Sequence, residues 1–181
     1  FSLGLIHYES LTDGENNATQ PTIIGDLRYN RRYFPKRVGG EVRLGFQLHG
    51  HYRYSDRDID GSDADSIVDG RDVARANLDL SWRDRWTLPG GLRAGAVTQV
   101  WVDHFIVEQD AVAEGDYTEV TPAGSLELRW PLVKQTTNGG RVLLEPIAQV
   151  GWIGGDRSCE PNDESTRAEF DEGNLLSLSR F

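Results

Sequence analysis

The sequence predicts an all-β protein, namely part of an antiparallel up-and-down transmembrane β-barrel with about seven strands of a larger barrel present. Two features of the chain support this fold class. Several segments alternate between apolar and polar side chains, as strands with one apolar and one wet face do. The connections between these segments also alternate in length, which is typical of barrels inserted in an outer membrane.

The clearest segment spans residues 41–55. At about 3.3 Å per residue it would be roughly 50 Å long, which exceeds an ordinary strand and is enough to cross a bilayer even when tilted. Tyr52 and Tyr54 stand at one end of its apolar face. A membrane–water interface favours aromatic side chains at such a position, because the ring is apolar and the hydroxyl is wet. The segment therefore predicts a membrane-spanning strand.

Six further segments follow the same pattern with varying regularity. They are residues 1–11, 26–33, 74–86, 92–107, 124–132 and 141–153. The segment 74–86 is interrupted only by Asp84, and it ends in tryptophans. The segments 1–11, 92–107 and 141–153 are apolar with poorer alternation, so their faces are harder to assign.

We expect the polar side of these strands to face a watery barrel interior and the apolar side to face lipid. The candidate lumen-facing residues are Arg43, Gln47, His49, His51, Arg53, Arg75, Asp79, Arg83, Glu127 and Arg129. The candidate lipid-facing residues are Val42, Leu44, Phe46, Leu48, Tyr52, Tyr54, Leu78, Leu80 and Trp82. The inward arginines are expected to pair with the acidic residues Glu41, Asp79, Asp103 and Glu127. Strands of a soluble protein with a solvated polar face would alternate in the same way, so periodicity alone leaves that alternative open.

The connections give a second, independent signal. They are expected at residues 12–21, 35–40, 56–72, 87–91, 109–119 and 134–140, with a tail from Gly154 onward. Long and short connections follow one another, a rhythm that a soluble Greek-key sandwich has no reason to show. The short connections carry proline, asparagine and paired glycines, which favour tight turns. We therefore expect the short turns in the periplasm and the long loops outside the cell.

Composition limits the class of protein further. The 181 residues carry a formal net charge of −10 and the pI is about 4.8, which argues against nucleic-acid binding. The chain lacks an apolar run of about 18 residues, so a helical membrane span is excluded. It starts at Phe1, contains no Met and shows no signal-peptide pattern. We therefore expect a fragment or a processed piece of a longer protein.

Three features that could indicate a metal or thiol site are incomplete. Residues 56–61 match the first half of a calcium loop, D-x-D-x-D-G, but Ile67 occupies the position of the bidentate glutamate. This segment is expected to be a solvated acidic loop, with weak divalent-cation binding near anionic lipid as the alternative. His49 and His51 share a strand face but have no evident third ligand, and Cys159 is the only cysteine, so no metal site is predicted.

Catalytic motifs are also missing. The chain contains no nucleophile elbow, phosphate-binding loop, H-E-x-x-H or C-x-x-C sequence. Its carboxylates lie in expected loops or alternate with arginine, rather than in an apolar pocket that would prepare them for acid–base catalysis. We expect neither enzymatic activity nor a bound cofactor.

The C-terminal part of the chain resembles a known family. The stretches that carry the resemblance are Leu-Glu-Pro-Ile-Ala-Gln at 144–149, Pro-Asn-Asp-Glu-Ser at 161–165, and the sequence of 170–181. Shorter pieces fit as well, at Gln20-Pro21, at 39–41 and at 70–72. These stretches resemble the lipopolysaccharide-assembly proteins of the Gram-negative outer membrane, the organic solvent tolerance protein or LptD family.

The resemblance implies that residues 1–181 are part of a single large outer-membrane barrel. Such a barrel receives lipopolysaccharide from a periplasmic bridge protein, holds a plugging lipoprotein in its interior, and releases the lipid into the outer leaflet. The family's periplasmic jelly-roll domain is not represented here. The alternatives are an outer-membrane porin or substrate transporter, a soluble β-sandwich binding module, and, more distantly, an outer-membrane lipase or protease.

Overall fold

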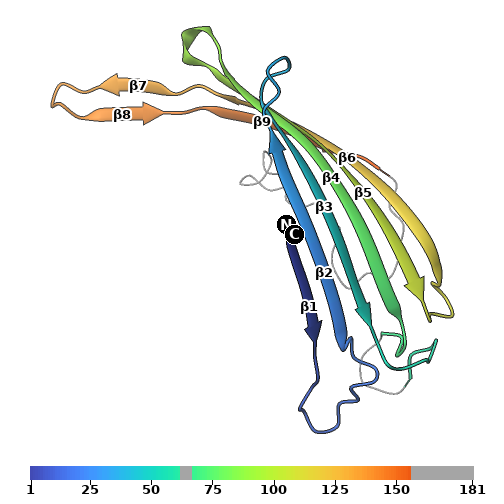
Figure 1. Ribbon diagram of the computed structural model, residues 1–181. Helices are drawn as coiled ribbons and strands as arrows, with labels where there is room; N and C mark the ends of the chain where they lie inside the picture. Colours follow the sequence, from blue (N-terminus) through green and yellow to red (C-terminus); the bar gives the residue numbers. More distant parts are fainter. Residues whose placement is uncertain (62–66, 156–181) are drawn as a thin grey trace.

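The computed structural model describes residues 1–61 and 67–155 as an almost entirely β structure. Seven strands form one sheet in the order β1-β2-β3-β4-β5-β6-β9 (Figure 1). Their bounds are Ser2–His7 (β1), Ile23–Tyr33 (β2), Glu41–Tyr52 (β3), Asp72–Thr87 (β4), Arg93–Glu108 (β5), Gly115–Arg129 (β6) and Ile147–Ile153 (β9). The short strands β7 (Leu132–Gln135) and β8 (Arg141–Leu144) pair with each other, and one 3₁₀ turn, η1, spans Pro89–Gly91.

Every neighbouring pair in the sheet is antiparallel, and each strand pairs with the next main-sheet strand along the chain. The sheet is twisted and strongly curved, with β1 and β9 at its two edges (Figure 1). No helix in the described ranges is long and apolar enough to span a membrane. The all-β, up-and-down antiparallel architecture expected from the sequence is confirmed.

The register sorts the strand side chains onto two faces. One row across the sheet contains apolar residues from five strands, namely Tyr29, Phe46, Leu78, Val102 and Val120. The adjacent row, on the opposite face, contains polar residues, namely Arg28, Gln47, Asn77, Asp103 and Glu119. Because side chains alternate along each strand, the same division continues over the sheet. We call these two surfaces the apolar face and the polar face.

Burial differs sharply between the two faces. The polar face holds nearly all of the buried strand side chains, including Arg75, Trp101, Asp103 and Phe105. On the apolar face, leucines near the middle of the strands stay open, and Leu80 is 50% exposed. A continuous exposed apolar surface of this kind marks contact with a non-aqueous environment or a partner.

Two strands differ from the sequence expectation. β6 begins at Gly115, so the connection expected at 109–119 shrinks to 109–114. Its first half reads Asp-Tyr-Thr-Glu-Val-Thr, where polar and β-branched residues occur on both faces and hide the alternation. The segment expected at 141–153 is not one strand, because Pro146 separates β8 from β9. A proline lacks the N–H that a continuous ladder needs.

The residues expected as a short turn at 134–140 form the tip of a hairpin. Backbone pairing along β6 ends where the Trp130 N–H donates to the Pro146 carbonyl at 3.0 Å. Pro131 follows Trp130 directly, so both strands of the hairpin meet a proline at the same level. Beyond these prolines, β7 and β8 project away from the edge of the sheet (Figure 1).

The connections gather at the two opposite ends of the strands (Figure 1). Residues 8–22, 53–61, 67–71 and 109–114 lie at one end of the strands, which we call the long-loop edge. Residues 34–40, 88–92 and the start of the β7–β8 hairpin lie at the other, which we call the short-turn edge. The expected alternation holds for the first four connections. The third long loop is short because β6 is longer than expected, and the connection from β6 to β9, expected as a short turn, is long because it contains the β7–β8 hairpin.

Candidate functional site

The polar face is the candidate functional surface, and its centre is a buried ion pair. The Arg75 guanidinium donates to Asp103 Oδ1 from Nε at 3.2 Å and from Nη2 at 3.1 Å. The Asn77 amide donates to the same oxygen at 2.8 Å, and the Arg75 guanidinium lies 5.7 Å from the centre of the Phe105 ring. Asp103 is fully buried. The network ties β4 to β5 and neutralises two charges that would be costly alone.

Further ion pairs occupy the same face on either side of this centre. Arg129 donates to both carboxylate oxygens of Glu127, at 2.7 and 2.9 Å. Glu41 accepts from Arg83 at 3.0 Å and lies 3.7 Å from Arg32. The expected pairing of arginine with Glu41, Asp103 and Glu127 is thus present in the structure.

Amides and a histidine take part alongside the arginines. Asp79 accepts a hydrogen bond from the Gln99 amide, and Glu127 accepts one from Gln149. Asp26 accepts from the Gln47 amide at 2.9 Å, and its carboxylate lies 3.6 Å from His49 Nδ1. Within residues 1–61 and 67–155, no three His, Cys, Asp or Glu side chains converge as metal ligands would.

In β3, β4 and β6, all the proposed lumen-facing residues lie on the polar face, and the proposed lipid-facing residues of β3 and β4 lie on the apolar face. Tyr54 and Arg53 lie just beyond β3. Tyr54 is open and packs edge-on against Tyr52 at 5.6 Å, whereas Arg53 is buried among the loops.

Arg53 connects two of the loops at the long-loop edge through hydrogen bonds. Its backbone N–H donates to Asp72 Oδ1 at 2.7 Å, and its side chain donates to the carbonyls of Thr19 and Arg71. The Ser55 N–H donates to the Ala18 carbonyl at 2.9 Å in the same region. Arg53 therefore joins two loops that are far apart in sequence, which periodicity along one strand cannot reveal.

A second set of contacts joins Asp58 and Arg71 to the 109–114 loop. Asp110 Oδ1 accepts from the N–H groups of Val112 and Ala113, both at 2.9 Å, and Oδ2 lies 3.5 Å from Arg71 Nη1. Burial alone would raise the pKa of Asp110, but these hydrogen bonds and the nearby Arg71 charge hold that pKa below its ordinary value. In the incomplete calcium-loop motif, Asp58 contributes its carbonyl, which accepts from the Ala111 N–H at 2.9 Å. Residues 62–66 of this loop and Cys159 lie outside the described residues.

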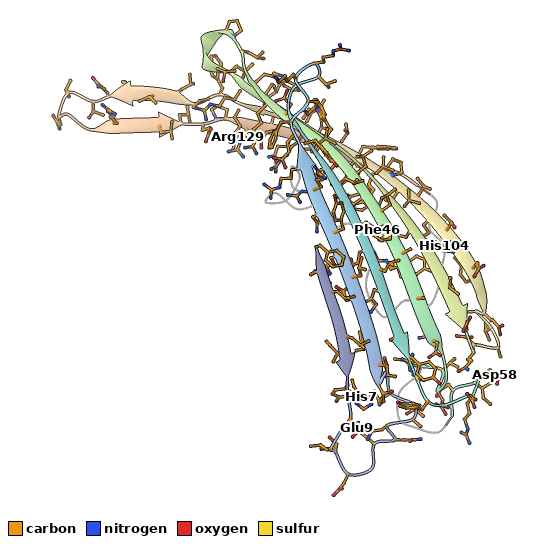
Figure 2. All side chains as sticks on the ribbon, viewed as in Figure 1. His7, Glu9, Phe46, Asp58, His104 and Arg129 are labelled. Atoms are coloured by element: carbon orange, nitrogen blue, oxygen red, sulfur yellow. The ribbon has the colours of Figure 1, made fainter. Side chains whose placement is uncertain are left out.

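The short-turn edge of the polar face contains two neighbouring cavities. The first has a volume of about 380 Å³, and Arg85, Arg93, Arg129, Glu127 and Glu145 line it above the backbone of Gly95. The second, of about 320 Å³, shares Arg85. Figure 2 places Arg129 at this edge, close to where the β7–β8 hairpin leaves the sheet. The list of candidate lumen residues did not include Arg85 and Arg93, although the alternation of their segments places both on the polar side.

A comparison with protein families decides the identity. The family model described as LptD, LPS transport system D, matches residues 1–181. The chain belongs to the LptD family. No curated protein and no solved structure matches the chain. As a member of LptD, the chain is an outer-membrane protein of the lipopolysaccharide transport system, and its open sheet is part of a transmembrane β-barrel.

Proposed function

We propose that this part of LptD forms a section of the wall of the translocon that inserts lipopolysaccharide into the outer leaflet. Residues 1–181 would then belong to a single barrel domain. The observation that carries the proposal is the division of the sheet into an apolar face and an ion-paired polar face. The polar face lines the lumen, and the apolar face contacts lipid.

The dimensions of the apolar face support a membrane position. Trp82 lies opposite Val42, and Tyr52 follows Val42 by ten residues along β3. At about 3.3 Å per residue this separation is roughly 33 Å, or about 23 Å along the membrane normal for a strand tilted by about 45°. That value is close to the apolar band of about 25 Å in outer-membrane barrels, which carries aromatic residues at both borders.

Lipopolysaccharide transport needs both faces. The cargo has charged sugars and apolar acyl chains, so a wall that separates water from lipid can accept the two parts on opposite sides. The charged side chains of the polar face suit either the anionic part of the cargo or a plugging lipoprotein. No bond is made or broken in such a step, so the proposal needs no catalytic group.

We further propose an orientation and a set of partners. The short-turn edge faces the periplasm, where the periplasmic bridge protein delivers lipopolysaccharide through a separate domain of the full-length protein. The long-loop edge faces outward. The difference in loop length between residues 53–71 and 88–92 supports this orientation, since outer-membrane barrels have short periplasmic turns.

Photo-crosslinking in living cells tests the proposal. A photoreactive residue at Gln47 or Gln99 of the full-length protein should capture lipopolysaccharide or the plugging lipoprotein. The same residue at Leu44 or Leu80, on the other face of β3 and β4, should capture only bulk lipid. If the polar-face positions capture neither partner while the barrel is assembled, a porin-like channel replaces the translocon as the function.

A further inference from the structure

The arginines at the short-turn edge of the polar face exceed the acidic residues available to them. Six arginines gather on this part of the face, namely Arg32, Arg43, Arg83, Arg85, Arg93 and Arg129. Four acidic residues accompany them around the two cavities, namely Glu41, Asp84, Glu127 and Glu145. The edge therefore carries a net positive charge, although the whole chain has a formal net charge of −10.

The register brings like charges together there. Arg93 of β5 lies directly opposite Arg129 of β6, and Arg32 of β2 lies directly opposite Arg43 of β3. Like charges in directly opposed positions of an antiparallel pair destabilise the sheet. Two such pairs at one edge indicate that the positive charge has a use other than holding the strands together.

The carboxylates present do not neutralise all of these arginines. Glu127 forms an ion pair with Arg129, and Glu41 forms ion pairs with both Arg83 and Arg32. Within residues 1–61 and 67–155, Arg43, Arg85 and Arg93 form no ion pair, and neither does Glu145. Arg85 and Arg93 thus line the first cavity without a carboxylate in ion-pair distance, although Arg85 interacts with Glu127 over a longer distance.

The centre of the same face shows what a structural arginine looks like in this sheet. Arg75 is buried, contacts Asp103 through two of its nitrogens and packs over Phe105. Arg85 and Arg93 are exposed instead, and the residues directly opposite them, Gly95, Thr87 and Arg129, carry no carboxylate. The contrast separates arginines that stabilise the wall from arginines that remain available to a ligand.

The cavity also has room for a ligand. Gly95 lies between Arg85 on β4 and Glu127 on β6, so no side chain fills the row between them. The space of about 380 Å³ above this glycine lies within the range of small-molecule sites in proteins. Guanidinium groups are planar forks that bind phosphate oxygens in a bidentate manner.

We propose that Arg85 and Arg93, beside the Arg129–Glu127 ion pair, form a binding site for a phosphate group carried on the sugar part of the transported glycolipid. This inference rests on the proposed function, because it places the site at the end of the lumen where the cargo arrives. Glu127 and Glu145 line the same cavity, where their negative charges limit the affinity and allow the cargo to leave. The site therefore binds the glycolipid transiently during its transport.

Binding measurements on the full-length protein with its lipoprotein partner, in detergent micelles, test the site. The probe is a fluorescently labelled phosphorylated disaccharide, compared with the same disaccharide without phosphate. The double substitution Arg85→Gln and Arg93→Gln should weaken binding of the phosphorylated probe at least about tenfold, because charge-assisted hydrogen bonds are lost. Arg31→Gln is the matched control, since Arg31 is exposed on the apolar face near the same edge.

The competing sources of phosphate are separated by two further arms. Inorganic phosphate and micelles containing phosphatidylglycerol are each added as competitors of the labelled probe. We expect both to compete weakly. Inorganic phosphate that binds as tightly as the phosphorylated disaccharide, or phosphatidylglycerol that displaces it, would overturn the assignment to the cargo.

Three other results would also contradict the proposed phosphate site. They are equal binding of the two disaccharides, unchanged affinity in the Arg85→Gln, Arg93→Gln protein, and an equal loss of affinity in Arg31→Gln. Failure of this site can be told apart from failure of the proposed function. If the phosphate site is wrong but the translocon is right, Gln47 and Gln99 still crosslink the cargo or the lipoprotein.

Discussion

Replacement of Phe46 by arginine tests whether the apolar face contacts the membrane interior. Phe46 lies near the middle of β3, five residues from Glu41 and six from Tyr52 (Figure 2). At about 3.3 Å per residue and a tilt of about 45°, it stands roughly 12 and 14 Å along the membrane normal from the two strand ends. Since the apolar band of a barrel is about 25 Å tall, Phe46 lies close to its midplane.

An arginine at that depth should reduce the free energy of unfolding by about 2 to 4 kcal/mol. The same change at the adjacent Gln47 places the guanidinium on the polar face, beside the carboxylate of Asp26. It should cost little. Val42→Arg offers a control at another depth, because Val42 lies one residue from the end of β3 and should cost about 1 kcal/mol or less.

Urea titration of the full-length protein in phospholipid vesicles measures these differences, with the folded species followed by its heat-modifiable electrophoretic mobility. We expect Phe46→Arg to be far less stable than the wild type, and Gln47→Arg and Val42→Arg to be close to it. Equal stability of Phe46→Arg and Gln47→Arg would refute the assignment of the two faces. A reversed order would shift the membrane-facing register by one residue.

Three further predictions concern topology, the buried ion pair and pH. In a Cys159→Ser background, a membrane-impermeant maleimide added to intact cells should label Val112→Cys at the long-loop edge, and it should leave Asn138→Cys at the hairpin tip unlabelled; the opposite result reverses the orientation. Asp103→Asn should destabilise the barrel by on the order of 3 kcal/mol in the same urea titration, because a buried guanidinium loses its charged partner, whereas the exposed Asp116→Asn should have no measurable effect. The lowered pKa of Asp110 means that its contribution to stability is present above the unfolded value of about 3.9 and is lost as the pH falls through the lower folded value. Hydrogen-exchange protection of its loop amides should therefore drop in acid, and a pH-independent protection would contradict the linkage.

The sequence predicted the two faces of β3 and β4 because alternation along those strands is nearly uninterrupted. Register in an antiparallel sheet follows from such alternation once one face prefers lipid and the other water. The arginine pairs followed as well, since residues on the same face of adjacent strands come within reach of one another. Asp103 was expected as a partner, and it is the acceptor at the centre of the network.

Other features depend on contacts that no local pattern encodes. The first half of β6 was missed because Thr118 and Thr121 put similar side chains on both faces. The projecting hairpin arises from Pro131 and Pro146, which fall at the same level only after β6 and β9 have paired. Arg53 continues the alternation of β3 in the sequence, but its side-chain partners come from the two long loops.

The distribution of charged contacts explains how one barrel wall can be stable and still bind a cargo. Lipid covers the apolar face of every strand in the same way, so that face does not determine which strands become neighbours. The order of the strands must therefore depend on the backbone ladder and on contacts of the polar face. Side-chain contacts on that face connect β2 to β3, β3 to β4, β4 to β5 and β6 to β9. Towards the short-turn edge, Arg43, Arg85 and Arg93 form no ion pair with any residue of the described ranges 1–61 and 67–155. The exposed charge of Arg85 and Arg93 is what the proposed phosphate site uses, because an anion can bind there and then move on.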